Sequence, residues 1–593
     1  MAGYRDLNGN GRMDPYEDPR RTVEERVADL LGQMMLEEKV GLLFHGMIGI
    51  DEGGELLEQA HLMNPHPTTE MVCERHLNHF NIYQVPEPRE LAEWHNRLQR
   101  LAESTRLGIP VTISTDPRHA FSDNPFTGMT ASGFSQWPEF LGLAAIGDEE
   151  LVQQFGDIAR REYCAVGIRV ALHPMADLAT EPRWARAHGT FGEDAELSGR
   201  MVAAYIRGFQ GETLGPDSVA CMTKHFPGGG PQKDGEDPHF SFGREQVYPG
   251  DQFEYHLSPF AAAFEAGTAQ IMPYYGMPVG TELEEVGFGF NKQVITGLLR
   301  ERFGFEGVVC TDWRLLTDAT ADGQVLVEAK CWGVEQLSLA ERARKALDAG
   351  VDQFGGETCT EVVLDLVRSG SVSEARIDES ARRILRDKFR LGLFDDPYVA
   401  AEIADECVGT AAYRAAGEVA QRRSLVLLSN SDTLPLSGKP RLYLHGISED
   451  VASHYGEIVS RPEDADFAIV RLATPFEPRE GFLESRFHAG DLDFKGEEKE
   501  RILELLAVVP SIVAIHLERP AVIPEIAAAS AALLGDFGAS DAALFDVLFG
   551  NAAAEGKLPF ELPSSMEAVR NAREDVPRDS AAPLFPFGHG LRL

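Results

Sequence analysis

The stretch that decides the fold is Gly304-Phe305-Glu306-Gly307-Val308-Val309-Cys310-Thr311-Asp312-Trp313. An amphipathic segment, 294–303, precedes it, and the glycines permit a tight turn into the apolar run 308–311. The order is therefore helix, turn and buried strand, with an aspartate at the carboxyl end of the strand. In a β/α barrel this position faces the active site, so Asp312 is the candidate for the residue that performs the chemistry. The alternative is that Asp312 caps the helix that follows.

Strand-like and helix-like segments alternate on both sides of this stretch. Short apolar runs that end in polar residues occur at 41–48, 110–115, 168–173, 219–223, 269–272, 308–311 and 351–354. Helical periodicity occurs at 22–40, 91–107, 149–163, 195–210 and 251–266. This alternation predicts a parallel α/β fold, a barrel or a doubly wound sheet, with its site at the carboxyl ends of the strands. Residues 52–85, rich in His and Pro, are predicted to form a long loop that contains a helix of unassigned position.

A second, smaller α/β domain is predicted in the last third of the chain. The helical stretch 377–391 ends in Gly-Leu-Phe-Asp-Asp-Pro-Tyr at 392–398, which is typical of a domain boundary. Beyond it, strands are predicted at 424–428, 441–444, 467–472 and 512–515, and helices at 499–507 and 541–548. Ser540 is placed to cap the last of these helices.

Composition and charge exclude several classes of function. The 593 residues are 43% hydrophobic and 25% charged, as in globular proteins of two or more domains. The formal net charge of -39 argues against a nucleic-acid or anionic-membrane partner, and no apolar run is long enough to span a membrane. The seven scattered cysteines fit a reducing compartment. We expect a cytoplasmic protein, or a secreted one if a signal peptide has been removed.

Residues 6–17 match the twelve-residue calcium loop of an EF-hand. Gly11 provides the sharp turn, and the candidate oxygen ligands are Asp6, Asn8, Asn10, the Arg12 carbonyl, Asp14 and Glu17. The alternative is an Asn/Gly-rich turn without an ion. Because no apolar helix precedes the loop, we predict a structural Ca²⁺ that pins the N-terminal arm rather than a calcium sensor. No organic cofactor is predicted.

Several motifs, taken in order, resemble glycoside hydrolase family 3. They are Met35-Leu36-Glu37-Glu38-Lys39-Val40, Lys224-His225-Phe226, the stretch 304–313, and the carboxyl-terminal runs 551–563 and 583–591. The resemblance covers nearly the whole chain. It implies a (β/α)8 TIM-like barrel followed by an α/β sandwich that completes the active site. The corresponding segments are a calcium-loop-bearing arm (1–20), the barrel (21–400) and the sandwich (401–593).

The same resemblance implies roles for individual residues. Asp312 would be the nucleophile of a retaining mechanism with a covalent glycosyl-enzyme. The sugar would be held by Asp116, Arg186, Lys224, His225, Met272, Tyr275 and Trp313. Arg183 is an alternative to Arg186, and Lys233 is expected to replace a cation that the family commonly has at position 235.

The acid/base would be a glutamate that follows the predicted strand 467–472. Glu477 is the first choice, Glu484 the second, and Glu480 lies between them. The β-N-acetylglucosaminidases of the same family use an Asp-x-His pair instead, and Asp237-Pro238-His239 resembles that pair with a displacement of two residues.

These features together predict a retaining exo-β-glycosidase that removes terminal β-D-glucose, a β-glucosidase. The substrate would be a small-molecule or oligosaccharide β-glycoside. Alternatives are a β-xylosidase, a β-N-acetylglucosaminidase, a phosphorylase or a non-catalytic carbohydrate-binding protein. The sequence leaves the oligomeric state open, with a homodimer as one alternative.

Overall fold

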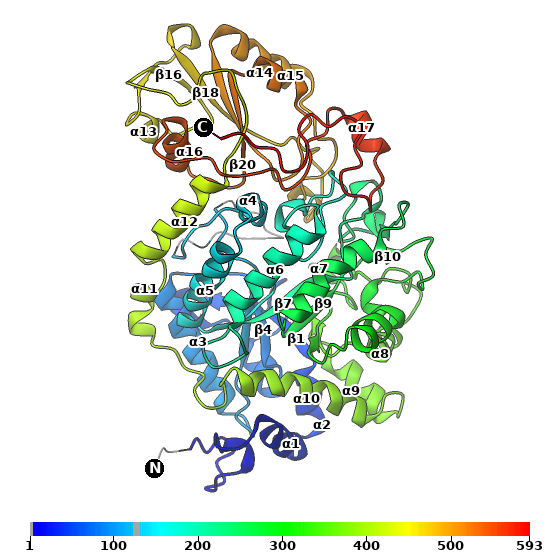
Figure 1. Ribbon diagram of the computed structural model, residues 1–593. Coiled ribbons are helices and arrows are strands. Elements are labelled where there is room, and N and C mark those ends of the chain that lie inside the picture. Colours follow the sequence, from blue (N-terminus) through cyan, green and yellow to red (C-terminus); the bar gives the residue numbers. More distant parts are fainter. Residues whose placement is uncertain (1–3, 122–130, 132, 322, 593) are drawn as a thin grey trace.

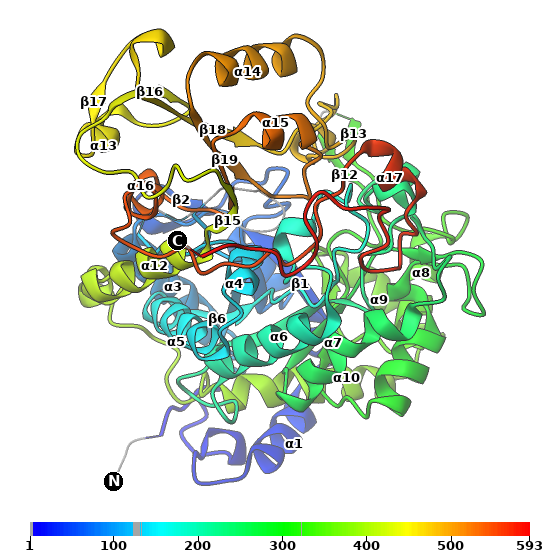
Figure 2. The same cartoon turned by 45° about the horizontal axis from the view of Figure 1, so that its top comes forward.

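The computed structural model describes residues 4–121, 131, 133–321 and 323–592. A β/α barrel forms the larger part, and a smaller α/β unit lies against one end of it (Figure 1). The N-terminal arm lies at the opposite end of the barrel. In Figure 2 the C-terminal segment, drawn in red, runs from the smaller unit back across the barrel. Thr180 of the barrel donates a hydrogen bond to the carbonyl of Glu574 in that segment, at 2.6 Å.

Within the described residues, eight parallel strands form the barrel in the order β11-β9-β7-β6-β5-β4-β1-β14. Their bounds are β1 Phe44–Ile48, β4 His79–Ile82, β5 Thr112–Thr115, β6 Ile168–Ala171, β7 Ala220–Phe226, β9 Gln270–Pro273, β11 Val308–Val309 and β14 Phe354–Gly355. A parallel bridge between Cys310 and Gln353 joins the two end strands. The backbone N–H of Thr311 donates to the carbonyl of Gln353 at 2.9 Å. The sheet is therefore closed, and the predicted fold class is confirmed.

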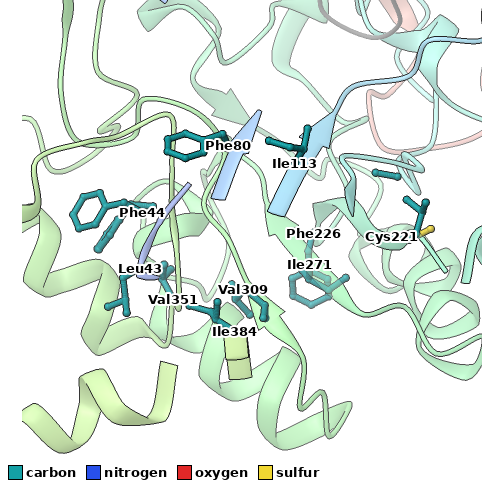
Figure 3. Close-up of a cluster of buried hydrophobic side chains, with 14 of the residues drawn as sticks. Leu43, Phe44, Phe80, Ile113, Cys221, Phe226, Ile271, Val309, Val351 and Ile384 are labelled. Carbon is teal, nitrogen blue, oxygen red and sulfur yellow. The ribbon is translucent and has the colours of Figure 1, made fainter. Parts of the chain in front are cut away.

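Amphipathic helices cover the barrel because each strand presents one face outward. They are α3 Pro88–Glu103, α4 Phe140–Ile146, α5 Glu149–Ala165, α6 Ala195–Gln210, α7 Phe253–Glu265, the π-helix η8 Gln293–Arg302, α8 Leu339–Ala349, α9 Thr360–Arg368 and α10 Glu374–Arg390. Figure 3 shows part of the resulting core, with Phe44, Phe80 and Val309 on barrel strands and Ile384 of α10 near Val309. Burying such side chains contributes about 1.5–3 kcal/mol each.

Two sequence-based expectations about the first domain need correction. Residues 52–85 contain a helix, the π-helix η3 (Glu70–Glu74), but they also contain a barrel strand, β4, that was not predicted. The strand is hard to recognise because His79 and Asn81 are polar, yet both are buried. The predicted helix 22–40 is two helices, α1 (Val23–Gln33) and α2 (Leu36–Leu42). The break occurs where the backbone of Met34 is extended, with φ of -71° and ψ of 138°.

The smaller unit is built on a six-stranded sheet in the order β15-β20-β19-β18-β16-β17 among the described residues. Its strands are β15 Val426–Asn430, β16 Arg441–His445, β17 Glu457–Ile458, β18 Phe467–Ala473, β19 Ser511–His516 and β20 Ala532–Asp536. Separate apolar cores lie on its two faces. One is covered by α14 (Gly496–Val508) and α15 (Pro524–Ala529), the other by α13 (Glu449–Ala452) and α16 (Asp541–Leu548). As predicted, Ser540 caps α16 by accepting from the Ala543 N–H.

The long helix α12 (Ala411–Ser424) leads from the barrel into the smaller unit. Several polar contacts then hold the two units together. Arg479 of the smaller unit pairs with Glu236 of a barrel loop through two 2.7 Å hydrogen bonds. His516 at the end of β19 lies 2.9 Å from Glu139, at the start of α4. These contacts place the loop after β18 over the carboxyl ends of the barrel strands.

Candidate active site

A cavity of about 400 Å³ opens at the carboxyl ends of the barrel strands, within the range typical of small-molecule sites. Of the residues predicted to bind substrate or act as nucleophile, it is lined by Asp116, Arg186, Lys224, Met272, Tyr275, Asp312 and Trp313. A second cavity, of about 510 Å³, lies among segments that precede β7, β9 and β11. That is the opposite end of the barrel, where residues are expected to stabilise the fold rather than to take part in a reaction. The first cavity is therefore the candidate active site.

Asp312 lies directly after the short strand β11 and is 8% exposed. Its Oδ1 accepts a hydrogen bond from the backbone N–H of Trp313 at 2.7 Å. Its Oδ2 accepts none from any described residue and lies 3.7 Å from Nε2 of His225. One carboxylate oxygen is thus fixed by the backbone, while the other is buried without a hydrogen-bond donor from the described residues. The carboxylate lies in the cavity wall and keeps lone pairs for a new bond, as a nucleophile requires.

Asp116 and Lys224 form an ion pair in the inner part of the cavity. Asp116 follows β5 and Lys224 is in β7, so the two residues come from strands on either side of β6. Lys224 Nζ lies 3.0 Å from Asp116 Oδ1. Although burial raises the pKa of Asp116, the charge and hydrogen bond of Lys224 act together with the charges of Arg118 and Arg186, and the pKa is lowered. Asp116 is therefore a charged acceptor and Lys224 a charged donor, a combination that can hold adjacent sugar hydroxyls.

His225 lies behind Asp312 rather than in the cavity wall. Its Nδ1 is 2.8 Å from Oδ2 of Asp177, whose Oδ1 accepts the Gly229 N–H at 2.5 Å. Burial lowers the pKa of His225 well below its ordinary value of 6.5, so the ring is neutral at neutral pH. Asp177 follows the apolar run 168–173 and was given no role from the sequence. The structure makes it the group that orients His225.

The glutamates predicted as acid/base do not reach the cavity. Among the described residues, neither Glu477, Glu480 nor Glu484 lines it. The Glu477 side chain is 58% exposed and lies 3.6 Å from Lys495. From this loop, Phe482, Leu483 and Arg486 line the cavity instead. The loop after β18 therefore supplies apolar wall and a cation, but no carboxylate.

The Asp237-Pro238-His239 pair does reach the cavity, through His239. His239 Nδ1 lies 2.6 Å from Oδ1 of Asp237. The other oxygen of Asp237 accepts from the Trp184 indole at 2.9 Å and the Tyr274 hydroxyl at 3.1 Å. Phe487 of the smaller unit packs against the His239 ring with centroids 5.0 Å apart. The second unit thus covers the Asp-His pair.

Two further alternatives from the sequence are resolved by position. Arg186 is buried and its guanidinium lies over the Tyr274 ring, 5.7 Å from the centroid. Arg183 instead pairs with Glu181 and is absent from the described cavity lining. Lys233, expected to replace a missing cation, is paired with Glu245 outside the cavity.

The sequence also missed Met47 and Asn81, which enter the cavity from β1 and β4.

The predicted calcium ligands lie in one hydrogen-bonded loop at the far end of the barrel. The Asp6 carboxylate accepts the N–H groups of Asn10 and Gly11, and the side-chain amides of Asn8 and Asn10 donate to Asp14. Glu17 accepts from the backbone of Leu7 and Asp14. Among the described residues no three His, Cys, Asp or Glu side chains are arranged to hold a metal. The oxygens suit Ca²⁺, but the two amides must rotate to face it. The ion stays a prediction.

The family is established by comparison with known proteins. Residues 35–386 match the glycosyl hydrolase family 3 N terminal domain, and residues 442–593 match the glycosyl hydrolase family 3 C-terminal domain. The chain belongs to glycoside hydrolase family 3. No described helix is both long and apolar enough to span a bilayer.

Among its relatives is the probable β-glucosidase C of Aspergillus flavus, which is 50% identical over 97% of this chain and 91% of its own length. A periplasmic β-glucosidase/β-xylosidase of Dickeya chrysanthemi is 44% identical over 99% of this chain and 93% of its own. The solved structure of a β-glucosidase from Erythrobacter marinus has a TM-score of 0.80 at 22% identity, covering 98% of this chain and 84% of that one. At that identity the likeness supports the fold alone.

Proposed function

We propose that this protein is a retaining exo-β-glucosidase. The observation that carries the proposal is the Asp312 carboxylate, which lines a cavity whose inner wall holds the Asp116–Lys224 pair. Charged donors and acceptors at the closed end suit a single terminal sugar ring. The relatives named β-glucosidase support glucose as that sugar.

In the first step, a carboxylate oxygen of Asp312 forms a bond to the anomeric carbon while the bond to the leaving oxygen breaks. A carboxylate suits this role because it stabilises an oxocarbenium-like transition state and can leave again. In the second step, water attacks the same carbon and Asp312 is released. Two inversions give net retention at the anomeric centre.

We assign the acid/base role to His239, with Asp237 as its positioning residue. Protonated at Nε2, His239 gives its proton to the leaving oxygen in the first step and takes one from water in the second. Asp237, held by Trp184, Tyr274 and the His239 backbone N–H, stays charged and supports the imidazolium. Glu477 and Glu484 are the alternatives, and each would need the loop after β18 to move.

A β-xylosidase is the second candidate, because the Dickeya chrysanthemi relative is named for both activities. Glucose and xylose differ by one hydroxymethyl group, which a pocket discriminates by only about 1–3 kcal/mol. The ratio of kcat/KM on the nitrophenyl β-glucoside and β-xyloside measures this preference. A β-N-acetylglucosaminide serves as the third substrate, and we expect it to be the poorest.

Azide rescue distinguishes the catalytic roles. Azide needs no base and can replace the missing carboxylate or the attacking water. We expect Asp312→Gly to give the α-glucosyl azide, and His239→Ala to give the β-glucosyl azide from a 2,4-dinitrophenyl glucoside. Glu477→Ala and Glu484→Ala should keep wild-type rates. Rescue of either glutamate variant, with no effect of His239→Ala, would return the acid/base role to the smaller unit.

The cysteines bear on the location of the protein. All seven are described, and they form no disulfide with one another. This fits a reducing compartment, so we propose a cytoplasmic enzyme, with a secreted one as the alternative that the periplasmic relative from Dickeya chrysanthemi supports. Fractionation of the source cells tests it, and activity in the culture medium or periplasm would contradict it.

A further inference from the structure

The outer part of the candidate active site differs in chemistry from its inner part. The inner wall carries the buried Lys224 and Asp312 and the half-buried Asp116. The outer wall is formed by side chains that are half-buried or exposed. Its apolar members are Leu62, Met63, Val327, Phe482 and Leu483, and Tyr83, Arg314 and Arg486 are polar side chains beside them. The cavity therefore changes from a polar end to an apolar mouth along the path that a bound glycoside would take.

Three segments that are far apart in the sequence build this mouth. Leu62 and Met63 come from the loop before β4, and Val327 from the hairpin of β12 (Ala319–Ala321) and β13 (Gln324–Val327). Phe482 and Leu483 come from the smaller unit. Both units therefore contribute apolar surface to one opening, which is continuous with the nucleophile's cavity.

The loop that carries Leu62 and Met63 is fixed by polar contacts beneath it. Asn64 is fully buried and donates to the carbonyl of His66 at 2.9 Å, while its oxygen accepts the Gly49 N–H at 3.1 Å. His61 Nε2 lies 2.6 Å from the Tyr83 hydroxyl. These contacts hold the apolar pair at the mouth, although Met63 is 36% exposed. Such exposure of apolar side chains at a site favours an apolar ligand group.

The polar side chains near the mouth make contacts within the protein. The Tyr83 hydroxyl bonds to His61, Arg314 donates to the Thr317 hydroxyl at 3.5 Å, and the Arg486 guanidinium lies over the Phe482 ring, 5.7 Å from its centroid. A second sugar ring at this position would need hydrogen-bond partners for its hydroxyls, and burying them unpaired is unfavourable. Binding of an alkyl, terpenoid or aryl group would instead be favourable, because it removes apolar surface from water.

We propose that this mouth is the leaving-group site for an apolar aglycone. The preferred substrates are then β-glucosides of apolar alcohols, rather than cello-oligosaccharides. The inference rests on the proposed β-glucosidase function and specifies the substrate class of the same site. It identifies Leu62, Val327 and Phe482, from the three segments, as specificity-determining residues.

The test compares methyl, hexyl and octyl β-glucosides with cellobiose, each below any micellar concentration. The alkyl alcohols have similar leaving-group chemistry, so differences in kcat/KM report binding at the mouth. We expect kcat/KM for octyl β-glucoside to exceed that for methyl β-glucoside by at least about tenfold, which corresponds to burial of about two methylene groups. The value of kcat/KM for cellobiose should be lower than that for octyl β-glucoside.

Phe482→Ala and Val327→Ser should each lower the octyl-to-methyl ratio by about threefold or more. Because both rates of the ratio are measured with the same variant, a partial loss of folded protein lowers them equally and leaves the ratio unchanged. The matched controls are Phe242→Ala and Val325→Ser, which change exposed apolar residues outside the described cavity lining and should keep the wild-type ratio.

The outcomes separate the two proposals. Hydrolysis of all the glucosides with an octyl-to-methyl ratio near one, or with cellobiose preferred, would overturn the apolar aglycone site and leave the β-glucosidase proposal standing. A high ratio that none of the mouth variants lowers would also overturn it. No turnover of any β-glucoside would overturn the proposed function and this inference together.

Discussion

Two buried carboxylates near the cavity have opposite surroundings. Asp312 keeps one oxygen without a hydrogen bond from the described residues, whereas Asp237 accepts bonds from His239, Trp184 and Tyr274. Burial alone would raise the pKa of Asp237, but the charge and hydrogen bond of His239 lower it to about 2. Asp237 therefore stays ionised and cannot itself deliver a proton. Pairs of carboxylates whose surroundings give them different roles in this way are typical of acid/base sites.

The pH dependence of kcat/KM tests the pairing of His239 with Asp237. Burial lowers the pKa of His239 below its ordinary value of 6.5, although Asp237 opposes the shift. Since the first step needs protonated His239, kcat/KM should fall as the pH rises through that lowered pKa. Asp237→Asn removes the opposing charge, so this descending limb should move to lower pH, with at least about a tenfold loss at pH 6.

Asp234→Asn is the matched control, because Asp234 is an exposed acid on the same loop. Its pH profile should match that of the wild type. A descending limb that stays in place in Asp237→Asn would show that another group donates the proton.

At the residue scale, the positions of Asp312, Asp116 and Lys224 in the cavity wall were predictable, because barrel topology fixes where a residue near the carboxyl end of a strand points. Which residues of the loop after β18 line the cavity was not predictable in the same way. Spacing along the loop after β18 does not determine which residue points into the cavity, and Phe482 and Leu483 occupy the places expected for a carboxylate.

At the scale of elements, long amphipathic helices were predicted closely, while β4 was missed. The predicted ranges 195–210 and 541–548 coincide with α6 and α16. Strand β4 alternates His79 and Asn81 with apolar neighbours, and its polar residues are buried inside a barrel that leads to a polar site. A sequence rule that expects buried strands to be uniformly apolar fails there.

The N-terminal loop is the element whose ion is still untested. Tyr16, which is fully buried, already anchors the arm by packing edge-on against Phe394, with centroids 6.4 Å apart. We expect Ca²⁺ to add to this anchor, so that the midpoint of thermal unfolding is a few degrees higher in calcium than in EDTA. Asn10→Ala, which changes an exposed side chain, should abolish the difference.

Isothermal titration provides the independent readout of that loop. Protein stripped with EDTA should take up about one Ca²⁺, and the Glu52→Gln control should do the same. If the stripped wild type takes up none, the loop is an Asn/Gly-rich turn without an ion.

At the scale of the whole molecule, the barrel and the smaller unit are linked by a buried ion pair. Burial alone would lower the pKa of His516, but the charge and hydrogen bond of Glu139 raise it to about 9. Because the folded pKa lies above the ordinary 6.5, the pair stabilises the folded state fully below pH 6.5. That stability is lost as the pH rises through about 9.

We therefore expect the free energy of unfolding to fall between pH 6.5 and 9 by up to about 3 kcal/mol from this pair. His516→Gln should flatten that slope, as measured by denaturant unfolding at several pH values. His454→Gln, at an exposed histidine of the same unit, is the control. An unchanged slope in His516→Gln would show that the pair contributes nothing to stability.

The order of the two units was predictable from the order of motifs, but the way they meet was not. Local periodicity says nothing about which loops face one another. The contacts of Arg479 with Glu236, and of Phe487 with His239, arise only when the chain is folded. The apolar mouth likewise combines three segments that share no sequence signal.

The most direct test of the central claim is to trap the covalent intermediate. A 2-deoxy-2-fluoro-β-glucoside with a dinitrophenyl leaving group should inactivate the enzyme, because fluorine slows the second step more than the first. Peptide mass spectrometry should then place one fluoroglucosyl group on Asp312. A label on another carboxylate, or continued turnover of β-glucosides without any label, would contradict the account.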